Sequence, residues 1–141
     1  MRARRRVKKD PLESAVFFID RSVGRKIAGP LRDAGLTVEL HDDHFAQDAQ
    51  DEEWLTEVGR RRWFVITRDE RIRYRYLEAT AAYEARVGLF VLVSKNLTGP
   101  QTAEAIIKAR SHIRRFISSH RRPFIAKVYR DGRVQKLDIK R

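Results

Sequence analysis

Apolar and polar positions along the chain follow two different periods, and each change of period marks an expected element. Nearly unbroken apolar runs at residues 15–19, 63–67 and 88–93 are short and rich in β-branched and aromatic side chains. Such runs are typical of strands that are buried on both faces, as in a parallel sheet. A shorter run from Thr37 to Leu40 predicts a further strand between the first two.

Segments with helical spacing lie between these runs. Ser22 is expected to cap a helix whose inner face holds Val23, Ile27 and Leu31, with Pro30 kinking or shortening it and Gly35 ending it in the left-handed conformation. Further helices are expected at residues 51–61, at residues 70–86, and from Thr98, where a capping-box spacing opens a long helix.

Strands that alternate with helices predict an α/β fold, with three layers and a mainly parallel sheet. Asp131-Gly132, between two runs of period two, predicts a C-terminal β-hairpin. We therefore divide the chain into a flexible basic arm at residues 1–10, a domain at residues 11–119 and a basic hairpin extension at residues 120–141.

Charge changes this picture because it is uneven. The chain has 31 Lys and Arg against 19 Asp and Glu. Residues 1–9 hold six bases and no acid, residues 120–141 hold eight bases and two acids, and the remainder is balanced. Basic ends of this kind suit a polyanion such as RNA. The middle contains an acidic stretch, residues 39–57, with eight acids and no Lys or Arg.

The lack of cysteine excludes several kinds of chemistry. It rules out a disulfide scaffold, a thiolate zinc site and a thiol nucleophile, and a reducing cytoplasm is the expected compartment. No apolar run approaches the roughly 20 residues of a membrane span, so no membrane association is expected.

Three acids stand where ligands bind in parallel sheets. Asp20 and Asp69 follow two different strands, and Asp51 begins a helix that should start near the same edge. Three converging carboxylates would repel one another unless a cation lay between them, and hard oxygen ligands favour Mg²⁺ or Mn²⁺. Any one of these acids alone would more often be a helix cap.

The surrounding strings strengthen the catalytic interpretation. Phe18-Ile19-Asp20-Arg21, Asp51-Glu52-Glu53-Trp54-Leu55 and Val65-Ile66-Thr67-Arg68-Asp69 resemble, in this order, the acidic signatures of PIN-like ribonuclease domains. The nearest type is the VapC-like toxin branch. The resemblance covers roughly residues 14–110.

This resemblance implies a Mg²⁺- or Mn²⁺-dependent endoribonuclease that hydrolyses RNA phosphodiesters, with Asp20, Asp51 and Asp69 as catalytic metal ligands. It also implies the toxin half of a toxin–antitoxin pair, with an antitoxin protein as partner and a homodimer as a further expectation. Many PIN domains carry a fourth acid two residues after the third, but here that position is Arg71. Candidate substitutes for that acid are Asp43, Glu52 and Glu70.

Four residues near the acids are candidates to bind RNA. Arg21, Arg68 and Arg71 are placed to hold phosphates, and Tyr74 to stack on a base. For each arginine, a solvated surface role is the commoner alternative.

Two other functions stay open. The first is a PIN-like fold that has lost catalysis and works as a nucleic-acid-binding or regulatory module, which Arg71 favours. The second is a phosphoacceptor receiver-like domain, which the terminal basic charge disfavours. His41 and His44 have a metal-ligand spacing, but we interpret them as part of a loop.

Overall fold

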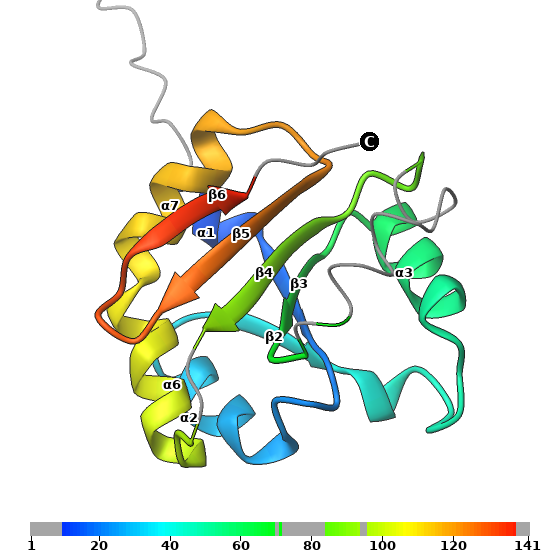
Figure 1. Cartoon of the computed structure of the whole chain (residues 1–141), viewed down its shortest axis with the longest axis horizontal. Coiled ribbons are helices and arrows are strands. Elements are labelled where there is room, and N and C mark those ends of the chain that lie inside the picture. Colours follow the sequence, from blue (N-terminus) through cyan, green and yellow to red (C-terminus); the bar gives the residue numbers. More distant parts are fainter. Residues whose placement is uncertain (1–9, 70, 72–83, 94–95, 138–141) are drawn as a thin grey trace, which may run out of the picture.

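One mixed sheet forms the centre of the molecule (Figure 1). The computed structural model describes residues 10–69, 71, 84–93 and 96–137. Within these residues the sheet has six strands in the order β2-β1-β3-β4-β5-β6. All neighbours pair in parallel except β5 and β6, which are antiparallel. The strands are β1 (Val16–Ile19), β2 (Thr37–Leu40), β3 (Phe64–Thr67), β4 (Gly88–Val93), β5 (Phe124–Tyr129) and β6 (Val134–Leu137).

Helices connect these strands. The described helices are α1 (Pro11–Ser14), α2 (Ala28–Asp33), α3 (Asp51–Arg60), α6 (Gly99–Lys108) and α7 (Arg110–Ser119), with 3-10 turns η1 (Arg25–Ile27) and η2 (His41–Asp43). No helix in the described part of the chain is long and apolar enough to cross a membrane.

The two faces of the sheet have separate apolar cores. Side chains of β1 alternate between them, with Phe17 and Ile19 in one core and Phe18 in the other. The first core packs against α1, α2, α6 and α7, and the second packs against Trp54, Leu55 and Val58 of α3. Helices therefore cover both faces of an α/β sheet (Figure 1). Each large side chain that is fully buried contributes about 1.5–3 kcal/mol to stability.

The strands agree closely with the sequence patterns. Predicted strands at residues 15–19, 37–40, 63–67 and 88–93 are confirmed as β1 to β4, with ends that differ by one residue at most. The capping box at Thr98 is also confirmed. The long helix that it opens is divided into α6 and α7, which meet at Ala109. The helix predicted at residues 70–86 lies mostly outside the described residues.

The predicted helix after β1 is wrong in its first half. Gly24 has a φ of 97°, a conformation that interrupts a right-handed helix. The chain instead makes a turn and η1 before α2 begins at Ala28. Pro30 lies in the first turn of α2, where its missing N–H leaves no helical hydrogen bond unmade. The prediction for Gly35 is confirmed, since its φ is 91°.

The C-terminal strands are continuous with the sheet. β5 pairs in parallel with β4 from Gly88 opposite Phe124 to Val93 opposite Tyr129, and β6 returns beside it after a turn in which Gly132 has a φ of 93°. Phe124, Ala126 and Val128 contribute to the first core. The boundary drawn before residue 120 therefore falls between segments that share one core.

The order in which the chain adds strands to the described sheet reverses at one point, between β1 and β3. From β1 the chain moves outward to β2 and then crosses back to β3, on the other side of β1. Outside the carboxyl ends of two such strands a crevice opens, and ligands bind there in open α/β sheets. In this chain the residues at that point are those that follow Ile19 and Thr67.

Candidate active site

Asp20 is the central side chain at the point where the strand order reverses. Its backbone N–H donates to the carbonyl of Ile66 at 3.0 Å, which extends the pairing of β1 and β3 by one step. One carboxylate oxygen, Oδ1, accepts the backbone N–H of Arg21 at 2.8 Å. The other, Oδ2, accepts the hydroxyls of Ser22 at 2.9 Å and Thr67 at 2.7 Å. The carboxylate is thus fixed in position by both strands.

Ser22 and Thr67 connect this carboxylate to the loop after β3. Each hydroxyl donates to Asp20, and each also accepts a backbone N–H: Arg68 donates to Ser22 at 3.0 Å, and Asp69 donates to Thr67 at 3.1 Å. Thr67 is fully buried. The two hydroxyls therefore set the position of the backbone that presents Asp69. Ser22 has this role instead of the helix cap that its sequence position suggested.

Asp69 lies next to the residue that replaces the fourth acid. Its Oδ1 accepts the backbone N–H of Arg71 at 2.9 Å and the Nε–H of the same residue at 3.1 Å. The Asp69 side chain is 24% exposed and that of Arg71 is 78% exposed. Arg71 therefore neutralises one of the predicted metal ligands in this conformation.

Arg68 points toward α6. Its guanidinium donates to the hydroxyl of Thr102, a fully buried residue of α6, and that hydroxyl donates to the carbonyl of Thr98. The Nε of Arg68 is buried and has no hydrogen-bond partner within the described part of the chain. This geometry links the loop after β3 to the start of α6. It gives Arg68 a positioning contact in addition to its predicted role with phosphates.

The acidic stretch folds against the residues after Asp20. Arg21 pairs with Asp42 at 3.1 Å and donates to the carbonyl of Gln47 at 2.9 Å, while Arg25 pairs with Asp43 at 3.4 Å. A hollow of about 110 Å³ lies here, with Asp20, Arg21 and Asp42 among its lining residues. Arg21 is therefore within reach of the site, and Asp43 has an arginine partner.

The two histidines of this stretch have separate contacts. His41 is buried, and its ring lies beside those of Phe18 and Trp54. His44 forms a hydrogen bond of 2.9 Å with Glu39. Their contacts agree with the loop interpretation of this pair.

Asp51 begins α3, and its Oδ1 accepts the indole N–H of Trp54 at 3.1 Å. Among the described residues, no three His, Asp or Glu side chains lie close enough together to hold a metal ion. The structure thus brings the segments of Asp20 and Asp69 together, and the role of Asp51 as a third ligand stays a prediction. Tyr74 lies outside the described residues.

The donor chemistry at Asp20 and Asp69 suits a hard cation. The side chains of Asp20, Ser22, Thr67 and Asp69 offer carboxylate and hydroxyl oxygens there, and Mg²⁺ is commonly held by one or two carboxylates together with waters and substrate phosphates. The sequence located both acids. It missed the hydroxyls, although Ser22 two residues after Asp20 and Thr67 within Thr-Arg-Asp were signals.

Comparison with protein-family models matched the description "PIN like domain" over residues 15–94, which is more than half of the chain. No curated protein and no solved structure matched. The matched residues run from the start of β1 to the end of β4 and include Asp20, Asp51 and Asp69. PIN-like domains include nucleases, and the chain belongs to this family.

Proposed function

We propose that this chain is a metal-dependent endoribonuclease and the toxin of a VapC-type toxin–antitoxin pair. The observation that carries the proposal is the fixed carboxylate of Asp20 at the point where the strand order of the sheet reverses. Two hydroxyls hold it, and both also orient the loop that presents Asp69. A helix cap would need neither of these contacts, whereas a ligand site needs its carboxylates held in place.

The protein groups would bind and orient the RNA. Asp20 and Asp69 would hold a Mg²⁺ or Mn²⁺ ion, with Asp51 as a further ligand. When bound there, the ion would lower the pKa of a water molecule and neutralise charge on the departing oxygen. Arg21 would hold a phosphate at the mouth of the hollow beside Asp20, because its guanidinium already lies between Asp42 and Gln47.

The reaction is a direct hydrolysis. The oxygen of water forms a bond to phosphorus, the bond between phosphorus and a ribose oxygen breaks, and the departing oxygen takes a proton. Arg71 would leave Asp69 and pair with a phosphate oxygen as RNA enters. The ion pair is exposed, so this exchange costs little.

The proposed partner is an antitoxin protein, and its place is the acidic edge beside Asp20. Asp42, Asp43 and Asp69 there have arginine partners from their own chain. A basic side chain of an antitoxin would replace these arginines and close the site to RNA. A homodimer, which the VapC resemblance implies, is part of the same proposal.

One observation favours a second function, a PIN-like module that binds nucleic acid without cutting it. Arg71 occupies the position of the fourth acid and pairs with Asp69, so it competes with a cation for that carboxylate. The same experiment separates the two functions.

The experiment is a cleavage assay on single-stranded and structured RNA with Mg²⁺, Mn²⁺ or EDTA. It compares the wild type with Asp20→Asn and Asp69→Asn. Asp33→Asn is the matched control, because Asp33 is an exposed acid of α2 outside the site. We expect cutting that needs the metal, falls at least a hundredfold in both site variants and is unchanged in the control.

Cutting that persists in EDTA or in Asp20→Asn would contradict the proposed metal site. No cutting by the wild type, together with salt-sensitive RNA binding that both variants retain, would contradict the proposed nuclease and support the nucleic-acid-binding module. Addition of Mn²⁺ should also raise the melting temperature of the wild type but not that of Asp20→Asn.

A further inference from the structure

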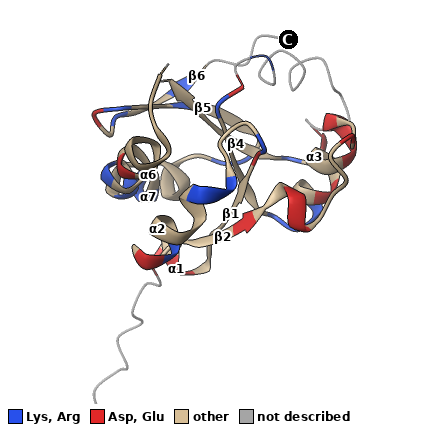
Figure 2. Cartoon of the chain, turned by 90° about the horizontal axis from the view of Figure 1, so that it is seen from below, with Lys and Arg blue, Asp and Glu red and all other residues tan. Residues whose placement is uncertain are grey.

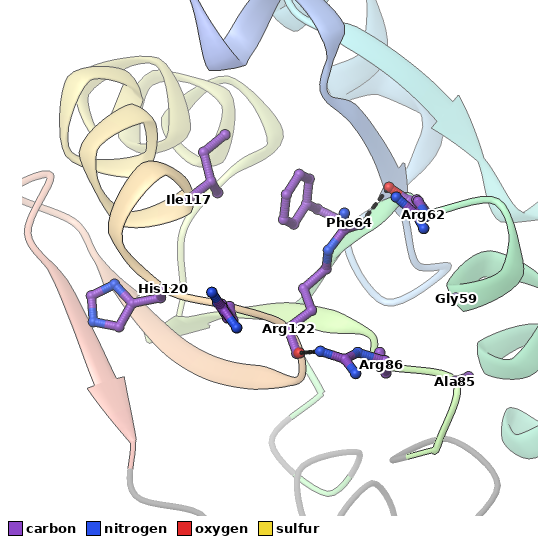
Figure 3. A pocket seen from close by; sticks show the side chains of 9 residues that line it. Gly59, Arg62, Phe64, Ala85, Arg86, Ile117, His120 and Arg122 are labelled. Atoms are coloured by element: carbon purple, nitrogen blue, oxygen red, sulfur yellow. Dashed lines mark hydrogen bonds between the residues drawn. The ribbon is translucent and has the colours of Figure 1, made fainter.

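A second site lies at the opposite edge of the sheet. A pocket of about 440 Å³ opens where β3, β4 and β5 begin (Figure 3). Its lining includes four arginines, Arg62, Arg86, Arg121 and Arg122, above an apolar floor of Phe64 and Ile117, and it includes no Asp or Glu. The strand-end acids lie at the other end of β3, roughly 13 Å away at about 3.3 Å per residue. The pocket is therefore separate from the candidate active site.

The arginines come from three segments and are partly fixed by one another. Arg122 donates from Nη1 to the carbonyl of Arg62 at 2.6 Å, and its guanidinium lies 4.8 Å from the centre of the Phe64 ring. Arg86 donates from Nη2 to the carbonyl of Arg122 at 3.1 Å. Both hydrogen bonds end on backbone carbonyls, so they organise the pocket without neutralising any charge (Figure 3).

The backbone at this pocket is unusual at two points. Arg62 has a φ of 60° and Arg86 a φ of 63°, a region that residues other than glycine seldom adopt. Each lies just before a strand, in the turn that brings its segment to the pocket. At Arg62 this conformation ends α3, since the backbone N–H of Arg62 donates to the carbonyl of Gly59 and that of Trp63 to the carbonyl of Val58, and the helix end thereby places Arg62 at the pocket.

The positive charges lie close enough to affect one another. Burial, and then the neighbouring charges of Arg62 and Arg86, lower the pKa of Arg122. No hydrogen bond or ion pair among the described residues engages the guanidinium groups of Arg62 and Arg121, so their donors are available. An anion in the pocket would relieve this repulsion and accept those donors.

We infer that the pocket binds a phosphate group of a nucleic-acid strand, at a site distinct from the strand-end acids. Guanidinium groups pair with phosphate oxygens through two parallel hydrogen bonds. Guanidinium groups that come from three segments suit a ligand whose oxygens point in several directions. A phosphodiester holds two charged oxygens and two ester oxygens in four tetrahedral directions, whereas the two oxygens of a carboxylate lie in one plane, so an acidic peptide would satisfy fewer of these donors. The inference rests on the proposed function only in naming the strand as RNA.

The test is a binding titration by fluorescence anisotropy, with a labelled 12-nucleotide single-stranded RNA in EDTA at several salt concentrations. The variant is Arg62→Gln with Arg121→Gln, since both side chains are exposed and we expect the fold to tolerate their loss. The control is Lys26→Gln with Arg115→Gln, which removes two exposed positive charges outside the pocket. Circular dichroism melts verify that both variants are folded.

We expect the pocket variant to bind RNA about tenfold more weakly at 0.1 M salt, with a salt slope smaller by about 1 to 2. The control should change affinity by less than about threefold. Equal losses in the two variants, or no loss in either, would overturn the inference. A poly-glutamate peptide that displaces RNA from the wild type but not from the pocket variant, at an equal charge concentration, would assign the pocket to an acidic protein and overturn it as well.

Failure of this inference and failure of the proposed function give different results. Binding in EDTA does not depend on cutting. If the wild type cuts no RNA but the pocket variant binds RNA more weakly than the control, the phosphate site is supported and the proposed nuclease is contradicted. If the wild type cuts RNA but the pocket variant binds RNA as the control does, the proposed nuclease is supported and the phosphate site is contradicted.

Discussion

Thr67 joins the two halves of the candidate site through a single hydroxyl. Its oxygen donates to Asp20 at 2.7 Å and accepts from the backbone N–H of Asp69 at 3.1 Å, and the residue is fully buried. Thr67 itself is enclosed, whereas the two aspartates that it contacts are half-buried. A change that keeps the volume but removes the oxygen would therefore leave a polar group of each aspartate without this partner.

Replacement of Thr67 by valine tests this role because valine has nearly the same shape. We expect Thr67→Val to lower the free energy of unfolding by about 1–3 kcal/mol, because the carboxylate of Asp20 and the backbone N–H of Asp69 each lose a hydrogen-bond partner. Thr67→Ser keeps the hydroxyl and loses one methyl, so its loss should be about 1 kcal/mol. Urea unfolding of the three proteins measures both values. A serine variant that is less stable than the valine variant would show that packing, and not the hydroxyl, dominates.

Single residues of the site were predictable to different degrees. Asp20 and Asp69 could be found because an acid directly after a buried strand must lie at the sheet edge. The sequence pattern predicts a helix cap at Ser22, since serine is a preferred residue at the start of a helix. Its true partners, Asp20 and the N–H of Arg68, come from the contact between β1 and β3, which a local pattern does not contain.

Among the helices and strands, the strands were the more predictable. Their apolar runs are buried on both faces, so the pattern and the environment agree for β1, β3 and β4. The segment after β1 failed because Gly24 adopts a positive φ, which its sequence neighbours do not reveal. The sequence also showed the hairpin turn at Gly132 but not that β5 pairs with β4, since pairing between distant strands depends on the whole sheet.

The C-terminal end of α3 carries an ion-pair cluster centred on Glu57. The Glu57 carboxylate accepts from Arg60 Nε at 2.9 Å and from Arg61 Nε at 3.3 Å. The hydrogen bond from Arg60, followed by smaller contributions that include Arg61, lowers the pKa of Glu57 from 4.5 to about 2. The charged form is thus the one that the folded state favours.

A lowered folded-state pKa sets the sign of the effect on stability. The contribution of Glu57 is fully present above its unfolded pKa of 4.5 and is lost as pH falls through about 2. We expect Glu57→Gln to be less stable than the wild type at pH 7, by a small amount because the pair is exposed, and the difference to vanish between pH 4.5 and 2. Urea unfolding at several pH values measures it. A difference that persists unchanged at pH 2 would assign the effect to the shape of the side chain.

The two edges of the sheet differ in charge, because the acids at one edge have arginine partners and the pocket at the other edge is lined by arginines without an acid. Segments that hold Asp and Glu lie along α3 and beside β2 (Figure 2), and Asp42 lines the same hollow as Asp20. The arginine pocket lies at the opposite edge. The charge balance of the middle of the sequence concealed this arrangement, because Arg62 and Arg86 meet Arg121 and Arg122 only in the folded chain. In the proposed function, basic groups would hold the RNA and acidic groups would lie beside the bond that is cut.

The basic residues 1–9 are expected to raise the affinity of the chain for RNA. They carry six Lys and Arg and no acid. If each base that contacts a phosphate contributes about 0.7 to the salt slope on single strands, their removal should lower the slope by about 1 to 4. Affinity at 0.1 M salt should fall, because fewer condensed cations are released on binding. A filter-binding titration in EDTA, with residues 1–9 deleted, measures the slope.

The control for this deletion keeps the length of the segment and replaces its six bases by glutamine. Both proteins should lose the same part of the salt slope, because the effect depends on charge and not on chain length. The loss should also add to that of Arg62→Gln with Arg121→Gln, since two separate groups of phosphate contacts release their cations independently. An unchanged slope after the deletion would show that the basic segment does not contact RNA, and the arginine pocket would then account for a larger share of the affinity.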